Sequence, residues 1–275
     1  MTAICKEKAQ YLEIGAERLY VITFGCEAPK AKVLLCGPSP SNRLFSLAAW
    51  VRWARFLAQH NFAAVRFDYR GTGESTGEFL EMTFRDWLDD IQQVSAWADS
   101  QLGKSPLVLH GMGMGGLLAQ RVFNSGRGDA LLLWSPLPRA ADVFDQALRM
   151  RLSLDMVQVR GENRKSAQHY MSEMASGKPF EAEGYYWSFG LWQSASEINL
   201  DTTHSQPGEG VAGRRPWRHA RLGVELVPLT PSVRQQSVFR SRATLGADPP
   251  LNPDFNPFFE SNVEWLRRVV EAGQG

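Results

Sequence analysis

The chain has 275 residues, and 44% of them are hydrophobic. This length and composition allow one large α/β domain, or one such domain with an inserted cap. The formal net charge of +1 gives no electrostatic footprint for nucleic acid or for an anionic membrane surface, so we expect neither as a partner.

The cysteines and the start of the chain narrow the class of protein further. Cys5, Cys26 and Cys36 are odd in number and have no C-x-x-C spacing, which indicates neither a disulfide framework nor a zinc site. The first ten residues are too polar for a signal-peptide core, and no apolar stretch is long enough to span a bilayer. We therefore expect a cytoplasmic protein with no metal and no cofactor.

The first half of the chain predicts strands and helices in alternation. Short apolar runs bounded by turn residues indicate strands, and apolar residues at helical spacing indicate helices. Thr83, with Asp86 three residues later, is a helix N-cap signal. The first strand alternates only loosely, as an edge strand does. The expected strands are 18–24, 32–36, 63–67, 107–109 and 130–134, and the expected helices are 43–59, 84–98 and 115–124.

This alternation requires right-handed crossovers and a parallel sheet. Strand signals then disappear between about 138 and 200, where helices are expected at 143–156 and 161–175. An aromatic cluster at 185–192 either lines an apolar pocket or packs this segment on the body, and we favour packing. The chain resumes with a late strand at 224–229, a loop at 230–258 and an amphipathic closing helix at 258–270. We therefore expect a core of 1–137 and 201–275, with a helical lid insertion at 138–200.

One turn dominates the sequence. An apolar run ending at His110 meets the frame Gly111-Met112-Gly113-Met114-Gly115 and passes directly into a helical segment. This has the form of a nucleophile elbow, G-x-S-x-G, in which a sharp strand-to-helix turn raises one side chain above the sheet. Gly113 stands where the serine belongs. A nucleophile in such a turn usually has positive φ, at a cost of about 1–3 kcal/mol, and glycine adopts that conformation with little penalty.

The same glycines permit a second interpretation. Gly111, Gly113 and Gly116 also fit G-x-G-x-x-G, a phosphate-binding turn of dinucleotide-binding proteins. That fingerprint belongs to the first strand–helix unit of its fold, whereas this turn follows about 105 residues of chain. A nucleotide-binding module is therefore the less favoured alternative.

The order of motifs resembles the α/β-hydrolase superfamily. The resemblance is carried by Asp68-x-x-Gly-x-Gly-x-Ser75, by the elbow frame, and by the insertion after 131–136. A narrower likeness is to hydrolases associated with the exosortase A system of bacteria, type 2. It is carried by the turn at 71–79, by Trp87-Leu-Asp-Asp90, by Leu133-Trp-Ser-Pro136 and by the segment 148–152. The resemblance implies an α/β-hydrolase fold with a mostly parallel sheet, flanking helices and a lid, and a small-molecule ester or acyl ligand.

The chemistry implied by this resemblance does not transfer to the residues present. A serine hydrolase needs a nucleophile, a histidine base and an acid that orients the base. Gly113 has no hydroxyl. The loop before the closing helix, residues 252–258, contains no histidine, and Asn256 stands near the expected position. The acid is expected within 201–222, where Asp201 is the nearest carboxylate.

Other residues near the turn are candidates for displaced roles. The loop after the first buried strand offers Cys36, Ser39 or Ser41 as a substitute nucleophile, and His110 adjoins the elbow, although a structural role for His110 is favoured. In the superfamily this loop and the residue after the nucleophile supply oxyanion-hole N–H groups. Here they correspond to the loop beginning at Gly37 and to Met114, with Met112 beside the pocket, while Pro38 removes one donor.

The sequence therefore predicts a protein descended from an ester or acyl hydrolase that is inactive or accessory, with a link to exopolysaccharide biology by resemblance only. An active carboxylester or thioester hydrolase with a relocated nucleophile is the alternative. The sequence leaves the oligomeric state open.

Overall fold

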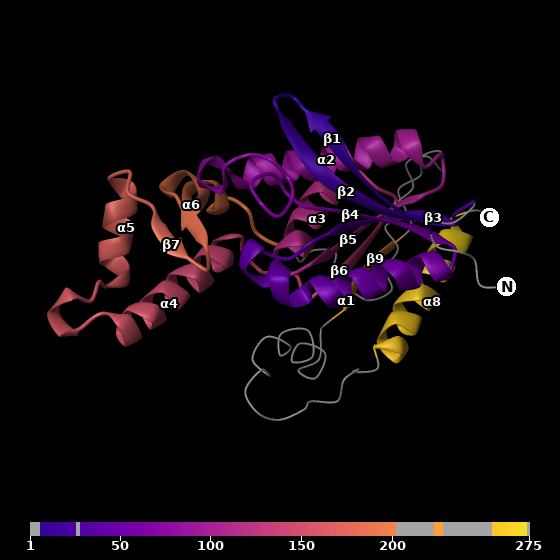
Figure 1. The fold of residues 1–275 in the computed structure, drawn as a ribbon. Coiled ribbons are helices and arrows are strands. Elements are labelled where there is room, and N and C mark those ends of the chain that lie inside the picture. Colours follow the sequence, from indigo (N-terminus) through magenta and orange to yellow (C-terminus); the bar gives the residue numbers. More distant parts are fainter. Residues whose placement is uncertain (1–5, 26–27, 202–222, 228–254, 274–275) are drawn as a thin grey trace.

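The computed structural model describes residues 6–25, 28–201, 223–227 and 255–273, and a seven-stranded sheet lies at its centre (Figure 1). The strand order is β1-β2-β4-β3-β5-β6-β9. The strands from β4 to β9 in this order run parallel, whereas β1 and β2 are antiparallel to their neighbours. The bounds are β1 Lys6–Ile14, β2 Glu17–Gly25, β3 Ala31–Cys36, β4 Phe62–Phe67, β5 Leu107–Met112, β6 Ala130–Trp134 and β9 Gly223–Val227.

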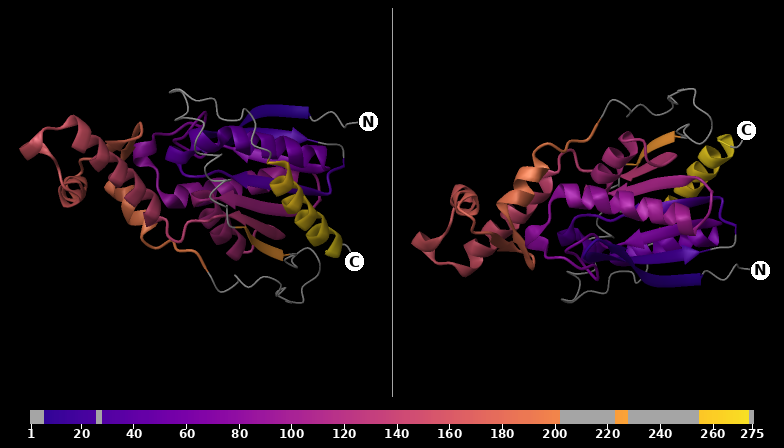
Figure 2. Two further views of the ribbon diagram at one scale, coloured as in Figure 1. Left: turned by 90° about the horizontal axis from the view of Figure 1, so that it is seen from below. Right: turned by 90° about the horizontal axis from the view of Figure 1, so that it is seen from above.

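Helices cover both faces of the sheet, as Figure 2 shows from two sides. On one face lie α1 (Pro40–Gln59) and α8 (Asn256–Ala272), which share an apolar cluster with the strands. On the other face lie α2 (Phe84–Gln101) and α3 (Met114–Asn124). The central strands are buried at every position of β3 and β4, because parallel strands covered on both faces have no solvent side. The expected α/β architecture is confirmed.

The edge of the sheet differs from the prediction. Residues 18–24 were expected at the edge, but β2 is an inner strand, and β1 pairs with it from Lys6↔Gly25 to Ile14↔Glu17. The sequence KEKAQYLEI of β1 is largely charged and mostly exposed, so it lacks the apolar signal of a strand. Its backbone hydrogen bonds to β2 hold it in place, together with Leu12 and Ile14, which are half-buried against the core. Charge along such an edge also opposes pairing with other chains.

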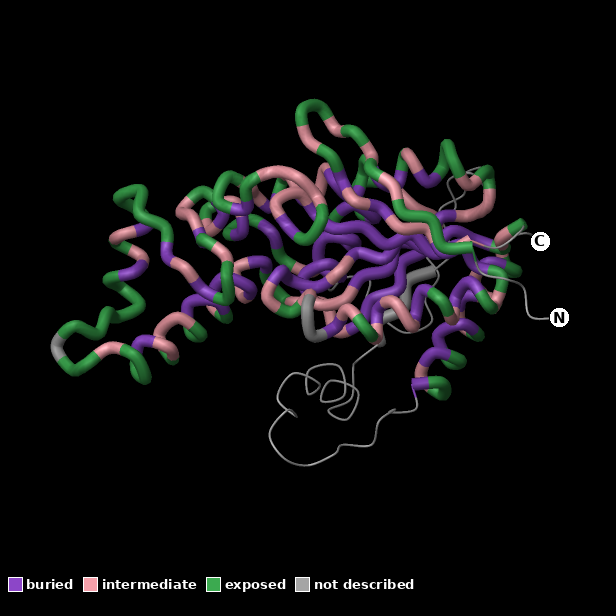
Figure 3. The backbone as a smooth tube through the Cα atoms, in the orientation of Figure 1, coloured by how far each residue is buried: buried purple, intermediate pink, exposed green. Residues whose placement is uncertain are grey.

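The chain that follows β6, up to Asp201, extends from the carboxyl end of that strand and is called the insertion below (Figure 1). Burial decreases toward its outer end (Figure 3). The helix expected at 143–156 is present within α4, whereas the one expected at 161–175 is α-helical only from Ala167, after a short 3-10 turn. A short hairpin within the insertion was not expected. Its turn has positive φ at both Glu183 (55°) and Gly184 (81°), as a type I′ turn requires, and its strands are too short to produce a periodic pattern. The elements are α4 Ala141–Gln158, η2 Gly161–Asn163, α5 Ala167–Ala175, β7 Phe180–Ala182, β8 Tyr185–Trp187 and α6 Phe189–Ala195.

The aromatic cluster of the insertion serves packing, as favoured above. Trp187 is fully buried, and its ring centroid lies 5.3 Å from that of Phe79 and 5.9 Å from that of Phe144. Tyr185 also contacts Phe79, with centroids 4.6 Å apart. Phe79 belongs to the short helix η1 (Phe79–Glu81), which follows the turn after β4. These contacts join the inner part of the insertion to the body through one apolar cluster.

Candidate active site at a glycine elbow

The turn between β5 and α3 has the backbone of a nucleophile elbow. Gly113 has φ 58° and ψ −119°, a conformation that side chains of L-residues rarely adopt. Its N–H donates to the carbonyl of Trp134 (3.1 Å), and its own carbonyl accepts from the N–H of Leu137 (3.0 Å). These bonds tie the turn to the end of β6 and to the beginning of the insertion. Gly113 is partly exposed at the carboxyl edge of the parallel sheet, where ligands of α/β proteins bind.

The three glycines of the elbow differ in whether a side chain would fit at their position. A Cβ on Gly111 would lie 2.3 Å from the carbonyl oxygen of Gly115, and a Cβ on Gly115 would lie 2.1 Å from the carbonyl oxygen of Gly37. Both positions are closed to any side chain because backbone atoms occupy the space. A Cβ on Gly113 would meet only the Pro38 Cβ at 3.9 Å. The position of the missing serine is therefore strained but sterically open.

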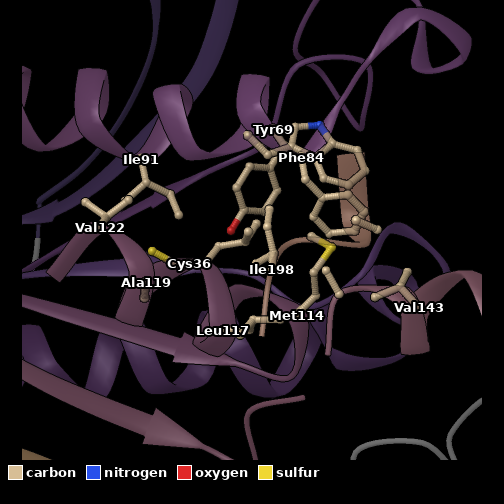
Figure 4. Close-up of a cluster of buried hydrophobic side chains, with 14 of the residues drawn as sticks. Cys36, Tyr69, Phe84, Ile91, Met114, Leu117, Ala119, Val122, Val143 and Ile198 are labelled. Atoms are coloured by element: carbon tan, nitrogen blue, oxygen red, sulfur yellow. The ribbon is translucent and has the colours of Figure 1, made fainter. Parts of the chain in front are cut away.

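The elbow leaves one backbone N–H free of a helical acceptor, at the position predicted for an oxyanion-hole donor. Met114 is the first residue of α3, so its N–H has no acceptor within the helix. Its side chain enters the apolar cluster near Val143 (Figure 4). The facing loop contributes less, because Pro38 and Pro40 have no N–H, which leaves that of Ser39. Met112 and Met114 flank Gly113 in the turn, and the Gly37 carbonyl lies against Gly115, so a role of these residues in ligand binding stays a prediction.

Two of the three proposed substitute nucleophiles, Cys36 and Ser39, are buried, whereas Ser41 is half-buried in the first turn of α1. Cys36 is fully buried among Ile91, Ala119 and Val122 (Figure 4), and burial raises the pKa of its thiol far above the usual range. Ser39 is also buried, and its Oγ accepts a hydrogen bond from Asn42 Nδ2 (3.0 Å). Neither group contacts an imidazole within the described residues. A thiol that stays protonated is a poor nucleophile.

His110 lies away from the elbow. Its ring packs with those of Trp50, Trp53 and Trp134 at centroid distances of 5.0, 6.0 and 4.5 Å, on the side of the sheet covered by α1 and α8. Its Nδ1 hydrogen-bonds the Leu132 carbonyl at 2.8 Å. Burial lowers the pKa of His110 to about 3, although that hydrogen bond acts in the opposite direction. The side chain is a neutral part of the core, as the structural interpretation held.

This burial makes stability depend on pH. Between pH 6.5 and 3 the unfolded chain binds a proton at His110 that the folded protein does not, so stability is lost as pH falls through this window. From pH 7 to pH 5 this group should reduce the free energy of unfolding by about 2 kcal/mol. His110→Phe should remove that difference, measured by urea denaturation at both pH values.

A matched control is His169→Gln, because His169 is exposed on α5 and pairs with Glu173 at 3.5 Å. It should keep the pH dependence of the original protein. An unchanged difference in His110→Phe would contradict the assignment.

The remaining histidines and the acid do not complete a triad in the described part of the chain. His60 caps α1 with its Nδ1 2.8 Å from the Phe56 carbonyl oxygen. His204 and His219 lie outside the described residues, as do residues 252–254 of the loop at 252–258. Asn256 is exposed at the first position of α8.

Asp201 is held along α3. Its backbone N–H donates to Gln120 Oε1 (2.7 Å), and its Oδ2 accepts from Asn124 Nδ2 (3.2 Å). Gln120 is roughly two helical turns beyond Gly113. The carboxylate is therefore not next to the elbow, and the expectation that it could serve as the acid has no support in this geometry.

The turn after β4 positions charged groups beside the elbow. Asp68 accepts two hydrogen bonds from Arg43, from Nη2 at 2.6 Å and Nε at 3.2 Å, and one from the N–H of Glu74. Ser75 Oγ donates to the Asp68 carbonyl (2.5 Å). A Cβ on Gly73 would lie 2.2 Å from Asp68 Oδ2, so this glycine makes room for the ion pair. The Asp68–Ser75 motif is thus a structural device, and sequence reasoning missed its partner Arg43.

The elbow and the parallel sheet define a protein of the α/β-hydrolase fold. Residues 47–186 match the family described as serine aminopeptidase, S33, and the chain belongs to this family.

Solved structures agree with the fold. Est1E from Butyrivibrio proteoclasticus, determined with ferulic acid bound, is 15% identical with a TM-score of 0.59 and alignment over 96% of this chain and 100% of that one. The α/β hydrolase GrgF from a Penicillium species is 13% identical, with a TM-score of 0.60 over 97% and 99% of the two chains. A lidless α/β serine hydrolase from Xanthomonas campestris is 22% identical with a TM-score of 0.42. This chain covers only 62% of its length and aligns over 49% of its own. The curated proteins contain no match. None of the described helices is long and apolar enough to cross a membrane.

Proposed function

We propose that this chain is a binding or accessory protein that holds a small ester or acyl ligand at the elbow without cleaving it. The observation that carries the proposal is Gly113, which occupies the nucleophile position with elbow geometry and no hydroxyl. The burial of Cys36 and Ser39 and the core position of His110 support it. The sequence between β9 and α8, residues 228–255, contains no histidine.

The expected loss of catalytic rate when a triad is absent supports the same conclusion. Removing the triad of a serine hydrolase costs about six orders of magnitude in kcat, while binding and oxyanion donors alone leave roughly 10³–10⁴ over the uncatalysed rate. Such a residual rate is too slow for metabolic turnover. The open position at Gly113 and the Met114 N–H are compatible with ligand binding, which needs no nucleophile.

We propose the insertion as the lid of this site. It begins at the elbow itself, since the Leu137 N–H binds the Gly113 carbonyl, and its inner aromatic residues pack on the turn after β4. The narrower resemblance supports a role in exopolysaccharide export, which deletion of the gene in an exosortase-encoding bacterium would test by loss of surface polysaccharide.

The test of non-catalytic binding uses ethyl butyrate and a fluorophosphonate probe. The ester should raise the midpoint of thermal unfolding and be recovered intact, with butyrate release within about 10⁴-fold of the uncatalysed rate. The probe should leave the intact mass unchanged, while an active serine esterase of the same fold gains one adduct. A stoichiometric adduct, or turnover abolished by Ser39→Ala or Cys36→Ala, would instead establish the alternative of a relocated nucleophile.

A further inference from the structure

A small cavity lies next to the elbow, between the beginning of α1 and the carboxyl ends of β3 and β4. Its volume is about 20 Å³, and it is partly open to solvent. Pro38 lines it, and the Cβ of the same Pro38 is the nearest atom to the open position above Gly113. The cavity and the elbow therefore share a wall. A ligand that enters the cavity must extend toward Gly113 on one side.

The walls of this cavity carry an excess of positive charge. Arg43 and Arg66 both line it, and Asp68 is the one carboxylate among its lining residues. Arg43 is bonded to Asp68 through two nitrogens, whereas the nearest approach of Arg66 to Asp68 is 3.8 Å. The lining therefore has two guanidinium groups and one carboxylate, and the carboxylate is hydrogen-bonded to Arg43. The positive charge of Arg66 is left without a close partner in the lining. Charges of one sign in a partly enclosed site attract a ligand of the other sign.

Two hydrogen-bond donors of the lining are buried without a partner. Arg66 is 7% exposed and Trp50 is 3% exposed, yet Arg66 Nε and Trp50 Nε1 have no acceptor among the described residues. Leaving a buried donor unsatisfied costs about 1–3 kcal/mol, and more for a charged group, so such donors normally have a partner. Both side chains line the same cavity. The His110 ring packs 5.0 Å from that of Trp50 and its Nε2 also lacks a partner, but no hydrogen bond joins the two side chains. Both donors of the lining are therefore open to an acceptor that enters the cavity.

We propose that this cavity binds the carboxylate head group of the ligand, with Arg66 and Trp50 as its donors. The proposal rests on the binding function above, because it names the chemical class of that ligand. A carboxylate carries the single negative charge that the lining lacks, and its two oxygens accept hydrogen bonds from separate donors. A cavity of about 20 Å³ is close to the space that one water-sized group needs, so the carboxylate head group is the most that enters it and the rest of the ligand stays outside. The acyl chain then passes Pro38 and lies over Gly113, where the absence of a side chain leaves room.

The experiment compares butyrate with its neutral analogue butyramide. Butyrate should raise the thermal midpoint more than the neutral ester ethyl butyrate does at equal concentration, and butyramide should raise it no more than that ester. Arg66→Met should weaken butyrate binding about tenfold or more. Trp50→Phe keeps the aromatic ring and removes only the N–H, so it should weaken binding about fivefold while the protein folds normally. Arg85→Gln is the matched control: Arg85 is 81% exposed and pairs with Glu197 at 3.6 Å, so its loss changes the net charge equally without affecting binding.

Several results would overturn the proposal. Equal stabilisation by butyrate and butyramide would show that charge is not recognised, and stronger binding of inorganic phosphate would assign the cavity to a different anion. Stabilisation by none of these probes would leave water as the partner of both donors. Hydrolysis of an ester would contradict the non-catalytic function alone, because the carboxylate site would still be lost in Arg66→Met and Trp50→Phe.

Discussion

Gly115→Ala is expected to prevent folding, whereas Gly113→Ala is expected to be tolerated. The added Cβ of Gly115→Ala would lie 2.1 Å from the Gly37 carbonyl oxygen and 2.2 Å from that of Cys36. Both are backbone atoms of the β3 end, so the strand and α3 would have to separate. We expect a loss of about 4 kcal/mol or more, at the extreme of single substitutions. In Gly113→Ala the new Cβ has room, and the cost is backbone strain of about 1–3 kcal/mol.

Equilibrium denaturation with urea, monitored by circular dichroism, checks both variants. Gly113→Ser serves as the control for a polar side chain at the open position and should resemble Gly113→Ala. Equal losses at positions 113 and 115 would show that the turn itself, and not the close approach of β3, determines the need for glycine.

Arg70→Ala is expected to destabilise the protein by about 3–5 kcal/mol, because it leaves a buried carboxylate without its partner. Asp90 is fully buried on α2, and it accepts from Arg70 Nε at 2.5 Å and from the Arg70 N–H at 2.9 Å. The Trp87 Nε1 also donates to the Arg70 carbonyl (3.1 Å). The Trp87–Asp90 segment that carried the narrower resemblance thus fixes the turn after β4 against α2.

The double variant Arg70→Ala with Asp90→Asn separates the ion pair from the packing. Replacing the carboxylate by an amide should recover a large part of the loss, and the cycle should give a coupling energy above about 1 kcal/mol. Additive effects would contradict the assignment.

The effect of Arg70→Ala should also depend on pH. Burial raises the pKa of Asp90 to about 7, against the opposing effect of Arg70, so this group stabilises the folded state at low pH and loses that contribution as pH rises toward 7. Without Arg70, ionisation of the Asp90 carboxyl group costs more free energy in the folded state. The destabilisation by Arg70→Ala should therefore be larger at pH 8 than at pH 5.

The parallel core was predictable because each of its strands is a short apolar run between turn residues. The Thr83–Asp86 capping box was equally visible, and the structure contains it. β1 was missed because six of its nine residues are exposed and only its last part, with Leu12 and Ile14, packs on the core, so its apolar signal is short. The hairpin of the insertion was missed because three-residue strands contain no period.

The position of the elbow could be predicted from the sequence, but the residues that surround it in space could not. The spacing of Gly111, Gly113 and Gly115 located the elbow, yet only the coordinates show that two of these glycines are enforced by contact and one is not. Arg66 was a missed signal, since it is a charged residue inside the buried strand β4. The cavity that it lines is formed with α1 and with the turn after β4, which flank β4 in the sequence but enclose Arg66 only once α1 packs back along the sheet.

The clear space above Gly113 bears on how this lineage could regain catalysis. When neighbours refill the volume of a lost side chain, its return overpacks the site. No refilling has occurred at Gly113, and glycine and serine are separated by one base in their codons. A histidine base would be harder to restore, because residues 228–255 contain no histidine that could take this role. Under the proposed non-catalytic function, the evolutionary barrier to renewed chemistry therefore lies with the base, which residues 228–255 do not supply, and not with the alcohol.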